Sequence, residues 1–198
     1  MPEYKLTSVT PHMLLAQKHL EGQKPTTPIK VLFTDRDDTI NDDGPGYLHQ
    51  YEQMEIFPQA YQVLRQKQLQ GYFIVIVTNQ SGISKNKFSE QDFIQCMNDM
   101  ARDAYQTTGL VIDAVLYAKT SDDSEPWRKP NPQTFIEFSQ YFNVDRSKSY
   151  MMGDKTIDIL YGKNLGLTTI AVRTGTEICQ EADYVIDSIA DLKQIPFK

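Results

Sequence analysis

Cysteine is scarce in this chain, where only Cys96 and Cys179 occur among 198 residues. Two thiols make no disulfide framework, and they cannot supply the four thiolates of a zinc cage. No apolar run approaches the ~20 residues that a membrane-spanning helix needs. The first residues also lack the charged-then-apolar pattern of a signal peptide. We therefore expect a soluble, cytoplasmic protein that makes no contact with a membrane.

Basic charge is also in short supply. The chain has 20 Lys and Arg against 26 Asp and Glu, which gives a formal net charge of −6. This balance argues against a broad nucleic-acid-binding surface, although it allows one basic pocket for a phosphate. What the chain does contain is 40% hydrophobic and 23% charged residues, as globular domains do. Its length is sufficient for one α/β domain with a substantial core.

Short apolar runs alternate with amphipathic stretches along most of the chain. The clearest strand, residues 72–77, is apolar throughout, as in strands buried on both faces. The clearest helix has Ser89 as its cap and Gly109 as its stop. The alternation predicts an α/β fold with a doubly wound, mostly parallel sheet and helices on both faces. Expected strands are 31–33, part of 110–118, 149–152, 168–172 and 184–186, and expected helices are 58–70, 89–108, 131–142 and 156–165.

The first residues are expected to form an appendage. Thr10 can cap a short helix that Pro11 opens and that ends near Gly22. We therefore divide the chain into an appendage and linker, residues 1–28, and one domain, residues 29–198. Farther along, Asn131 is expected to cap the helix that Pro132 opens.

Two carboxylates one residue apart, Asp35 and Asp37, follow the first strand of the expected domain. Open α/β sheets bind ligands beyond the carboxyl ends of their strands. Two carboxylates on one turn can share a hard cation, while one acts as a nucleophile and the other handles a proton. Taken alone, such a pair is more often a turn or a solvated loop. Its interpretation therefore depends on the clusters that follow.

Polar clusters also follow later strands. Residues 78–82, Thr-Asn-Gln-Ser-Gly, can donate hydrogen bonds to phosphate oxygens. Arg128 and Lys129 could clamp a phosphate. Asp154 and Asp158 are four residues apart and share one helix face. Each cluster also has an ordinary interpretation, namely a turn, a solvated basic pair, and acids that offset a helix dipole.

In their order these clusters resemble the four motifs of the haloacid dehalogenase-like (HAD) phosphatase superfamily. The resemblance implies that Asp35 is the nucleophile and forms an aspartyl-phosphate, and that Asp37 is the general acid and base. It implies that Thr78 and Lys129 are catalytic residues that bind the transferring phosphoryl group. The spacing between the motifs leaves no room for an inserted cap domain.

The same resemblance implies a magnesium site. Mg²⁺ would be held by the Asp35 carboxylate, the backbone carbonyl of Asp37 and the Asp154 carboxylate. Asp158 would support Lys155 or the waters on the metal rather than bind the ion.

The residues within and around these motifs resemble one subfamily, the D-glycero-D-manno-heptose 1,7-bisphosphate phosphatases of lipopolysaccharide-core precursor synthesis. The resemblance extends over about residues 31–192 and rests on residues 35–37, 39–41, 46–49, 77–83, 87–90, 128–130, 153–155 and 172–175. It implies hydrolysis of the C7 phosphate of a sugar bisphosphate. The substrate contacts that it implies are Gly46, Tyr47, Asn79, Gln80, Ser81, Arg128 and Lys155. We expect the protein to be a monomer.

The chain departs from that subfamily at two places. Its members commonly hold zinc in a loop before Arg-Lys-Pro, but residues 117–127 contain no Cys or His, so no structural zinc is expected. Trp127 could pack in place of the zinc or stack on a ligand. Asp38 stands where the subfamily usually has glycine, which enters a tight turn more easily. Because it adds a negative charge beside the nucleophile, we expect reduced but real turnover.

Other functions remain open at this point. Histidinol-phosphate phosphatases share many of these motif residues. The 3′-nucleic-acid phosphatases share the open active site without a cap domain. Acidity and the lack of an aromatic–basic stripe count against the latter. A phosphoacceptor module such as a receiver domain also combines an acidic cluster with Thr and Lys. A catalytically silent phosphate-binding protein is the remaining alternative, and it is motivated by Asp38 and by the missing zinc loop.

Overall fold

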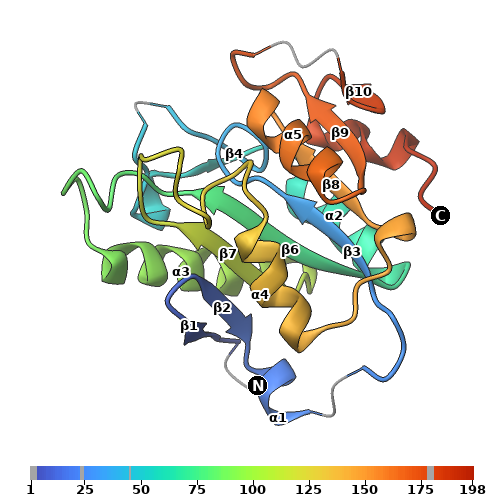
Figure 1. The fold of residues 1–198 in the computed structure, drawn as a ribbon, viewed down its shortest axis with the longest axis horizontal. Helices are drawn as coiled ribbons and strands as arrows, with labels where there is room; N and C mark the ends of the chain where they lie inside the picture. The colour runs from blue at the N-terminus through green and yellow to red at the C-terminus, as the bar shows by residue number, and fades with distance from the viewer. Residues whose placement is uncertain (1–3, 23–24, 45, 178–180) are drawn as a thin grey trace.

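A central sheet forms the middle of the molecule (Figure 1). The structure is a computed structural model, and it describes residues 4–22, 25–44, 46–177 and 181–198. In this described part the sheet has eight strands, ordered β1-β2-β7-β6-β3-β8-β9-β10. All pairings from β7 to β10 are parallel, and β1 and β2 are added antiparallel at one edge. The strands are β1 (Leu6–Thr10), β2 (Met13–Ala16), β3 (Lys30–Thr34), β6 (Tyr72–Asn79), β7 (Ala114–Ala118), β8 (Tyr150–Gly153), β9 (Thr168–Val172) and β10 (Tyr184–Ile186).

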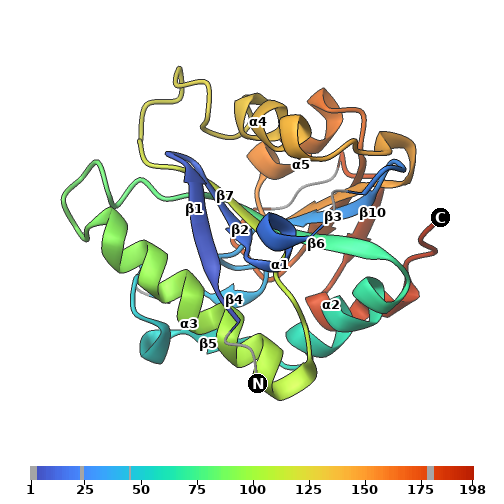
Figure 2. The same ribbon diagram turned by 90° about the horizontal axis from the view of Figure 1, so that it is seen from below.

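Helices cover both faces of this sheet (Figure 2). On one side lie α2 (Ala60–Leu69) and α3 (Glu90–Thr108), and on the other lie α4 (Gln133–Tyr141) and α5 (Thr156–Asn164). This arrangement confirms the predicted doubly wound α/β class. The small elements are α1 (Lys18–Glu21), the ribbon of β4 (Asn41–Asp42) and β5 (Glu55–Ile56), and 3-10 turns at Tyr51–Gln53, Arg146–Lys148 and Ile189–Gln194. Among the residues described, no helix combines the length and the apolarity needed to cross a membrane.

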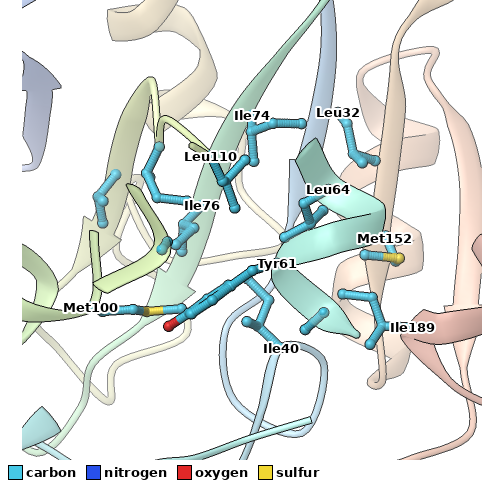
Figure 3. Close-up of a cluster of buried hydrophobic side chains, with 14 of the residues drawn as sticks. Leu32, Ile40, Tyr61, Leu64, Ile74, Ile76, Met100, Leu110, Met152 and Ile189 are labelled. Atoms are coloured by element: carbon cyan, nitrogen blue, oxygen red, sulfur yellow. The ribbon is translucent and has the colours of Figure 1, made fainter. Parts of the chain in front are cut away.

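Successive residues of the central strands pack into different hydrophobic clusters. In β3, Leu32 joins the cluster under α2 and α3, while Phe33 joins the one under α4. Figure 3 shows the first cluster, in which Tyr61 of α2 and Ile76 lie near Met100 of α3, while Leu32 lies nearer Leu64 of α2. Because side chains alternate across a strand, a strand that is covered on both faces must be apolar throughout. This requirement explains the unbroken apolar run in β6.

Local capping determines both ends of α3. The Ser89 hydroxyl accepts a hydrogen bond from the Asp92 N–H at 3.1 Å, and the Asp92 carboxylate accepts one from the Ser89 N–H at 2.8 Å. Gly109 ends the helix with φ +73°, a left-handed conformation that glycine enters easily. Both signals involve residues close in sequence, and the prediction for this helix is confirmed.

The helix expected from Thr10 to Gly22 is wrong. Strands β1 and β2 form a hairpin there, in which Thr10 pairs with Met13, and helix only appears in the short α1. Thr and Pro before an apolar run also suit a turn, and pairing of β2 with β7 decides in favour of a strand. Residues 23–24 of the expected linker lie outside the described part. The division at residue 28 stays a prediction.

The expected cap of α4 is also wrong. The helix has Pro132 at its N-cap, with no side-chain cap hydrogen bond. The Asn131 side-chain amide instead donates to the carbonyl oxygens of Asp123 at 3.1 Å and Glu125 at 2.9 Å. A short amide side chain serves a neighbouring loop as readily as a helix end, so the sequence alone does not distinguish the two.

Candidate active site

The polar clusters meet where β3, β6, β7 and β8 end. Asp35 follows β3, Thr78 lies near the end of β6, and Lys129 comes from the loop after β7. They border a cavity of about 320 Å³. Most residues predicted for the site line it, namely Asp35, Asp37, Gly46, Tyr47, Thr78, Asn79, Gln80, Ser81, Lys129, Lys155 and Asp158.

The Lys129 ammonium lies at the centre of the site and is 2% exposed. It donates to Asp35 Oδ1 at 2.5 Å, to Asp158 Oδ1 at 2.6 Å and to the carbonyl oxygen of Val77 at 2.7 Å. Burial alone would lower its pKa, but the carboxylates of Asp158 and Asp35 outweigh burial and raise it. Lys129 is therefore a permanent cation that contacts the carboxylate predicted to be the nucleophile.

Three buried carboxylates, those of Asp35, Asp154 and Asp158, have oxygens within 4.8 Å of one another. Burial, opposed by Lys129, raises the pKa of Asp35 to about 8. Burial and the nearby Asp158 raise the pKa of Asp154 to about 7. Lys155 lies 3.6 Å from Asp154, so two ammonium groups face three carboxylates. The raised pKa values of Asp35 and Asp154 show that positive charge is still short, so the cluster favours a further cation. All-oxygen donors of this kind suit Mg²⁺.

Asp158 is already engaged by protein donors. Its Oδ1 accepts from Lys129, and its Oδ2 accepts from the backbone N–H of Lys155 at 3.1 Å, where it caps α5. This geometry fits a supporting residue better than an ion ligand. Asp35 and Asp154 remain as the side chains suited to hold the cation. Asp154 is fully buried and is not among the residues that line the cavity, and Thr39 donates to its Oδ1 at 3.4 Å.

Arg36 belongs to the site, although the sequence motifs assigned it no role. Its side chain is 1% exposed, and it forms a fork to Asp37 with nitrogen–oxygen distances of 2.8 and 2.9 Å. It also donates to the carbonyl oxygen of Leu48 at 3.0 Å. Gln80 donates to Asp37 as well, at 3.3 Å. The Asn41 side-chain amide adds a hydrogen bond to Asp37 at 3.4 Å. Asp37 is therefore oriented by three residues, and the available signal for Arg36 was a basic residue between the two aspartates.

Asp38 adopts the backbone conformation that its replacement of glycine suggested. Its φ is +56°, in the left-handed region that glycine enters at least cost. Its Oδ1 accepts from the Asp43 N–H at 3.1 Å, and its Oδ2 lies 3.9 Å from Lys155 Nζ. The Asp38 carboxylate thus stabilises the position of Asp43, which precedes Gly46 and Tyr47 in the chain.

Two residues predicted to contact substrate are engaged elsewhere. Arg128 does not line the cavity, because its guanidinium binds Asp123 at 2.7 Å and the carbonyl oxygen of Thr120 at 3.1 Å. Asn79 lines the cavity, but its amide group bonds the backbone of Lys129 through both its oxygen (3.0 Å) and its nitrogen (3.2 Å). Asn79 therefore positions Lys129.

Close approach also explains two glycines. A Cβ at Gly175 would overlap the carboxylate of Asp154, and one at Gly153 would overlap Asp158. Gly175 follows β9, so its position past the carboxyl end of a strand was the signal that could have identified it.

Comparison with solved structures defines the class of protein. The hydrolase family model described as HAD-hydrolase-like matches residues 126–192. D,D-heptose 1,7-bisphosphate phosphatase from B. bronchiseptica, complexed with magnesium and phosphate, has a TM-score of 0.75 and 22% identity and covers 84% of this chain and 97% of that one. A candidate HAD-like phosphatase from Mesorhizobium loti has a TM-score of 0.76 and 26% identity and covers 93% of each chain. The fold is that of the HAD-like hydrolases.

Sequence relatives narrow this class. D-glycero-beta-D-manno-heptose-1,7-bisphosphate 7-phosphatase of Pasteurella multocida is 34% identical over 178 residues, covering 84% of this chain and 96% of that protein. The protein of the same name from Haemophilus ducreyi is 37% identical over 175 residues, covering 82% and 96%. The chain belongs to the family of D-glycero-D-manno-heptose 1,7-bisphosphate phosphatases. The predicted family and the predicted phosphatase class are confirmed.

Proposed function

We propose that this chain is a magnesium-dependent phosphomonoester hydrolase that removes the C7 phosphate of D-glycero-D-manno-heptose 1,7-bisphosphate. The observation that carries the proposal is the convergence of Asp35, Lys129 and Asp154, which follow strands β3, β7 and β8, at one edge of the sheet. The names of the relatives supply the substrate, and they specify the beta anomer. Action as a monomer in the cytoplasm, within lipopolysaccharide-core precursor synthesis, is part of the proposal.

The contacts of Asp35 support a two-step reaction. A carboxylate oxygen of Asp35 bonds to phosphorus while the bond from phosphorus to the C7 oxygen breaks, and Asp37 gives its proton to the departing alkoxide. Asp37 then takes a proton from a water whose oxygen attacks phosphorus, which releases inorganic phosphate and restores Asp35. The Lys129 ammonium and the Thr78 hydroxyl stabilise the charge on the transferring group.

The remaining site residues orient these groups. Arg36 and Gln80 hold Asp37 at the cavity, and Gln80 also donates to the Thr78 hydroxyl at 2.9 Å. Mg²⁺ held by Asp35, the Asp37 carbonyl and Asp154 would supply electrostatic stabilisation to the phosphate oxygens. Tyr47 is 40% exposed at the cavity and accepts a hydrogen bond from Lys85 at 3.0 Å. This open rim suits an extended sugar bisphosphate.

A phosphate-release assay tests the proposal. The substrates are both anomers of the heptose bisphosphate, histidinol phosphate and a 3′-phosphorylated oligonucleotide, each with Mg²⁺ and with a chelator. We expect kcat/KM for a heptose bisphosphate at least about tenfold above the others, because Tyr47, Ser81 and Lys155 at the cavity can donate hydrogen bonds to hydroxyl and phosphate oxygens. The chelator should abolish release, and added Mg²⁺ should restore it. Faster release from histidinol phosphate or from the oligonucleotide would mean that this compound, and not the heptose bisphosphate, is the substrate. A long-lived aspartyl-phosphate without release would favour a phosphoacceptor.

Replacing Asp38 by asparagine is expected to increase the rate. Asp38→Asn keeps an oxygen for the Asp43 N–H and removes a negative charge that opposes attack on a phosphate dianion. A threefold to tenfold rise in kcat is expected, about 0.7 to 1.4 kcal/mol of barrier. Asp38→Gly should show a similar rise and also remove the left-handed strain, worth about 1 kcal/mol of stability. The measurements are kcat, KM and the free energy of unfolding. An unchanged kcat in Asp38→Asn would show that this charge does not slow the reaction.

A further inference from the structure

The turn of the N-terminal hairpin lies at the same edge of the sheet as the active site. Strand β2 runs antiparallel to β7, with Met13 opposite Leu116. The turn residue His12 therefore lies opposite Tyr117, close to the carboxyl end of β7. Figure 2 shows this turn beside the loop that connects β7 to α4. That loop carries Lys129 into the site.

His12 makes three contacts with the chain around this loop. The Tyr117 N–H donates to the His12 carbonyl oxygen at 3.0 Å, and His12 Nδ1 lies 3.0 Å from the Tyr117 carbonyl oxygen. The imidazole also stacks on the indole of Trp127, with ring centroids 4.6 Å apart and planes inclined by 17°. The Thr10 hydroxyl adds a hydrogen bond to Glu137 of α4 at 3.2 Å. The hairpin thus contacts the loop at Trp127 and also the two elements that the loop connects, β7 and α4.

The middle of the loop is exposed and is held by hydrogen bonds within the loop itself, such as those of Arg128 to Asp123 and of Asn131 to Glu125. Residues 121–126 are all exposed, and Trp127 is the half-buried residue that follows them. The indole N–H of Trp127 is buried, and within the described residues it has no hydrogen-bond partner. The ring is therefore held by packing, in which His12 supplies a stacked face. Trp127 therefore packs on the protein, which is one of the two roles that the sequence allowed for it.

Trp127 is two residues from Lys129, whose ammonium must reach Asp35 from this segment. We propose that His12 is a positioning residue for catalysis: by stacking on Trp127, it fixes the segment from which Lys129 contacts the nucleophile. This inference rests on the proposed function. Displacements of about 1 Å at a catalytic group are sufficient to slow an enzyme by large factors.

The test uses the fact that Trp127 is the single tryptophan of the chain. Its emission therefore reports the stack directly, with or without substrate. His12→Ala should shift the emission to longer wavelength and lower kcat by about tenfold, with KM within about twofold, because Lys129 acts on the transition state. His12→Phe restores a stacking ring and should recover most of both signals. His12→Gln keeps polarity without a ring and should behave like alanine.

His19→Ala is the matched control. His19 belongs to the same N-terminal segment, but it stacks on Phe73 and bonds Asp113 at 2.8 Å, away from the loop. It should lower the melting temperature and leave kcat and the emission unchanged in assays well below that temperature. Equal losses of kcat in His12→Ala and His19→Ala would show that the hairpin only stabilises the fold. A His12→Ala kcat within twofold of the wild type would also overturn the proposal. If no phosphate ester is hydrolysed, the proposed function fails, while the emission still tests the stack.

Discussion

Asp35→Asn is expected to abolish phosphate release while the protein remains folded. An amide is a poor nucleophile and forms no aspartyl-phosphate, so kcat should fall by at least about 10⁴-fold, as when other enzymes lose their nucleophile. The substitution keeps the side-chain volume, and the amide oxygen can still accept the hydrogen bond from Lys129. Burial raises the pKa of Asp35 to about 8, so the site already disfavours a charge there. The free energy of unfolding should therefore change by less than about 1 kcal/mol.

Asp113→Asn is the matched control for Asp35→Asn, because it replaces a buried carboxylate that has no part in the proposed reaction. Asp113 is also a buried carboxylate, 2% exposed, and it accepts from the Ile74 N–H at 2.8 Å and from Lys18 at 2.7 Å. Its loss should destabilise the fold by about 1 to 3 kcal/mol, because charged donors lose their partner. Phosphate release should remain at the wild-type rate. If Asp35→Asn retained more than a hundredth of that rate, Asp35 would not be the nucleophile.

The fold was predictable where short-range signals and burial agree. The cap and stop of α3 involve residues within one turn, and the apolar run of β6 follows from burial on both faces. The hairpin β1–β2 was not predictable in this way. Its strands are short, and β2 becomes a strand by pairing with β7, which lies about a hundred residues later. Such a pairing leaves no local trace that distinguishes it from a capped helix.

In the candidate site, the positions of residues along the chain were predictable, but the directions of their side chains were not. Position past the end of a strand identified Asp35, Thr78 and Asp154, and these residues do gather at one edge of the sheet. The directions of the side chains were not predictable. Arg128 is a neighbour of Lys129 in sequence, yet Asp123 draws its guanidinium away from the cavity. Arg36 in contrast is buried, and its guanidinium orients Asp37.

Lys129→Met is expected to impair both rate and stability. The ammonium contacts Asp35 and Asp158 and would stabilise the charge that passes through the transferring phosphoryl group. Its removal should lower kcat by about 10³-fold, the loss typical of one strong electrostatic contact. The carboxylates left behind are buried and close together. Removing one partner of such a pair destabilises a protein by about 3 to 5 kcal/mol.

The response to a divalent cation distinguishes two causes of the destabilisation expected in Lys129→Met, namely uncompensated carboxylate charge and loss of packing. Methionine has nearly the length of lysine, so the cavity that it leaves is small, and the defect should be one of charge. Added Mg²⁺ should therefore stabilise Lys129→Met more than it stabilises the wild type, measured as the difference in free energy of unfolding with cation and with chelator. Equal stabilisation of the two proteins would contradict an origin in uncompensated carboxylates.

Lys67→Met provides the matched control for Lys129→Met. Lys67 is 4% exposed and lies over the ring of Phe197 at 3.9 Å, and burial lowers its pKa. It donates to a carbonyl oxygen, that of Ile195, at 3.4 Å, and no carboxylate pairs with it among the ion pairs of the described residues. Replacing it by methionine should change stability by less than about 1.5 kcal/mol and should leave kcat and the response to Mg²⁺ unchanged. A loss of stability in Lys129→Met no larger than in Lys67→Met would mean that the site tolerates three buried carboxylates without its lysine. In that case the role of Lys129 would be confined to the chemical step.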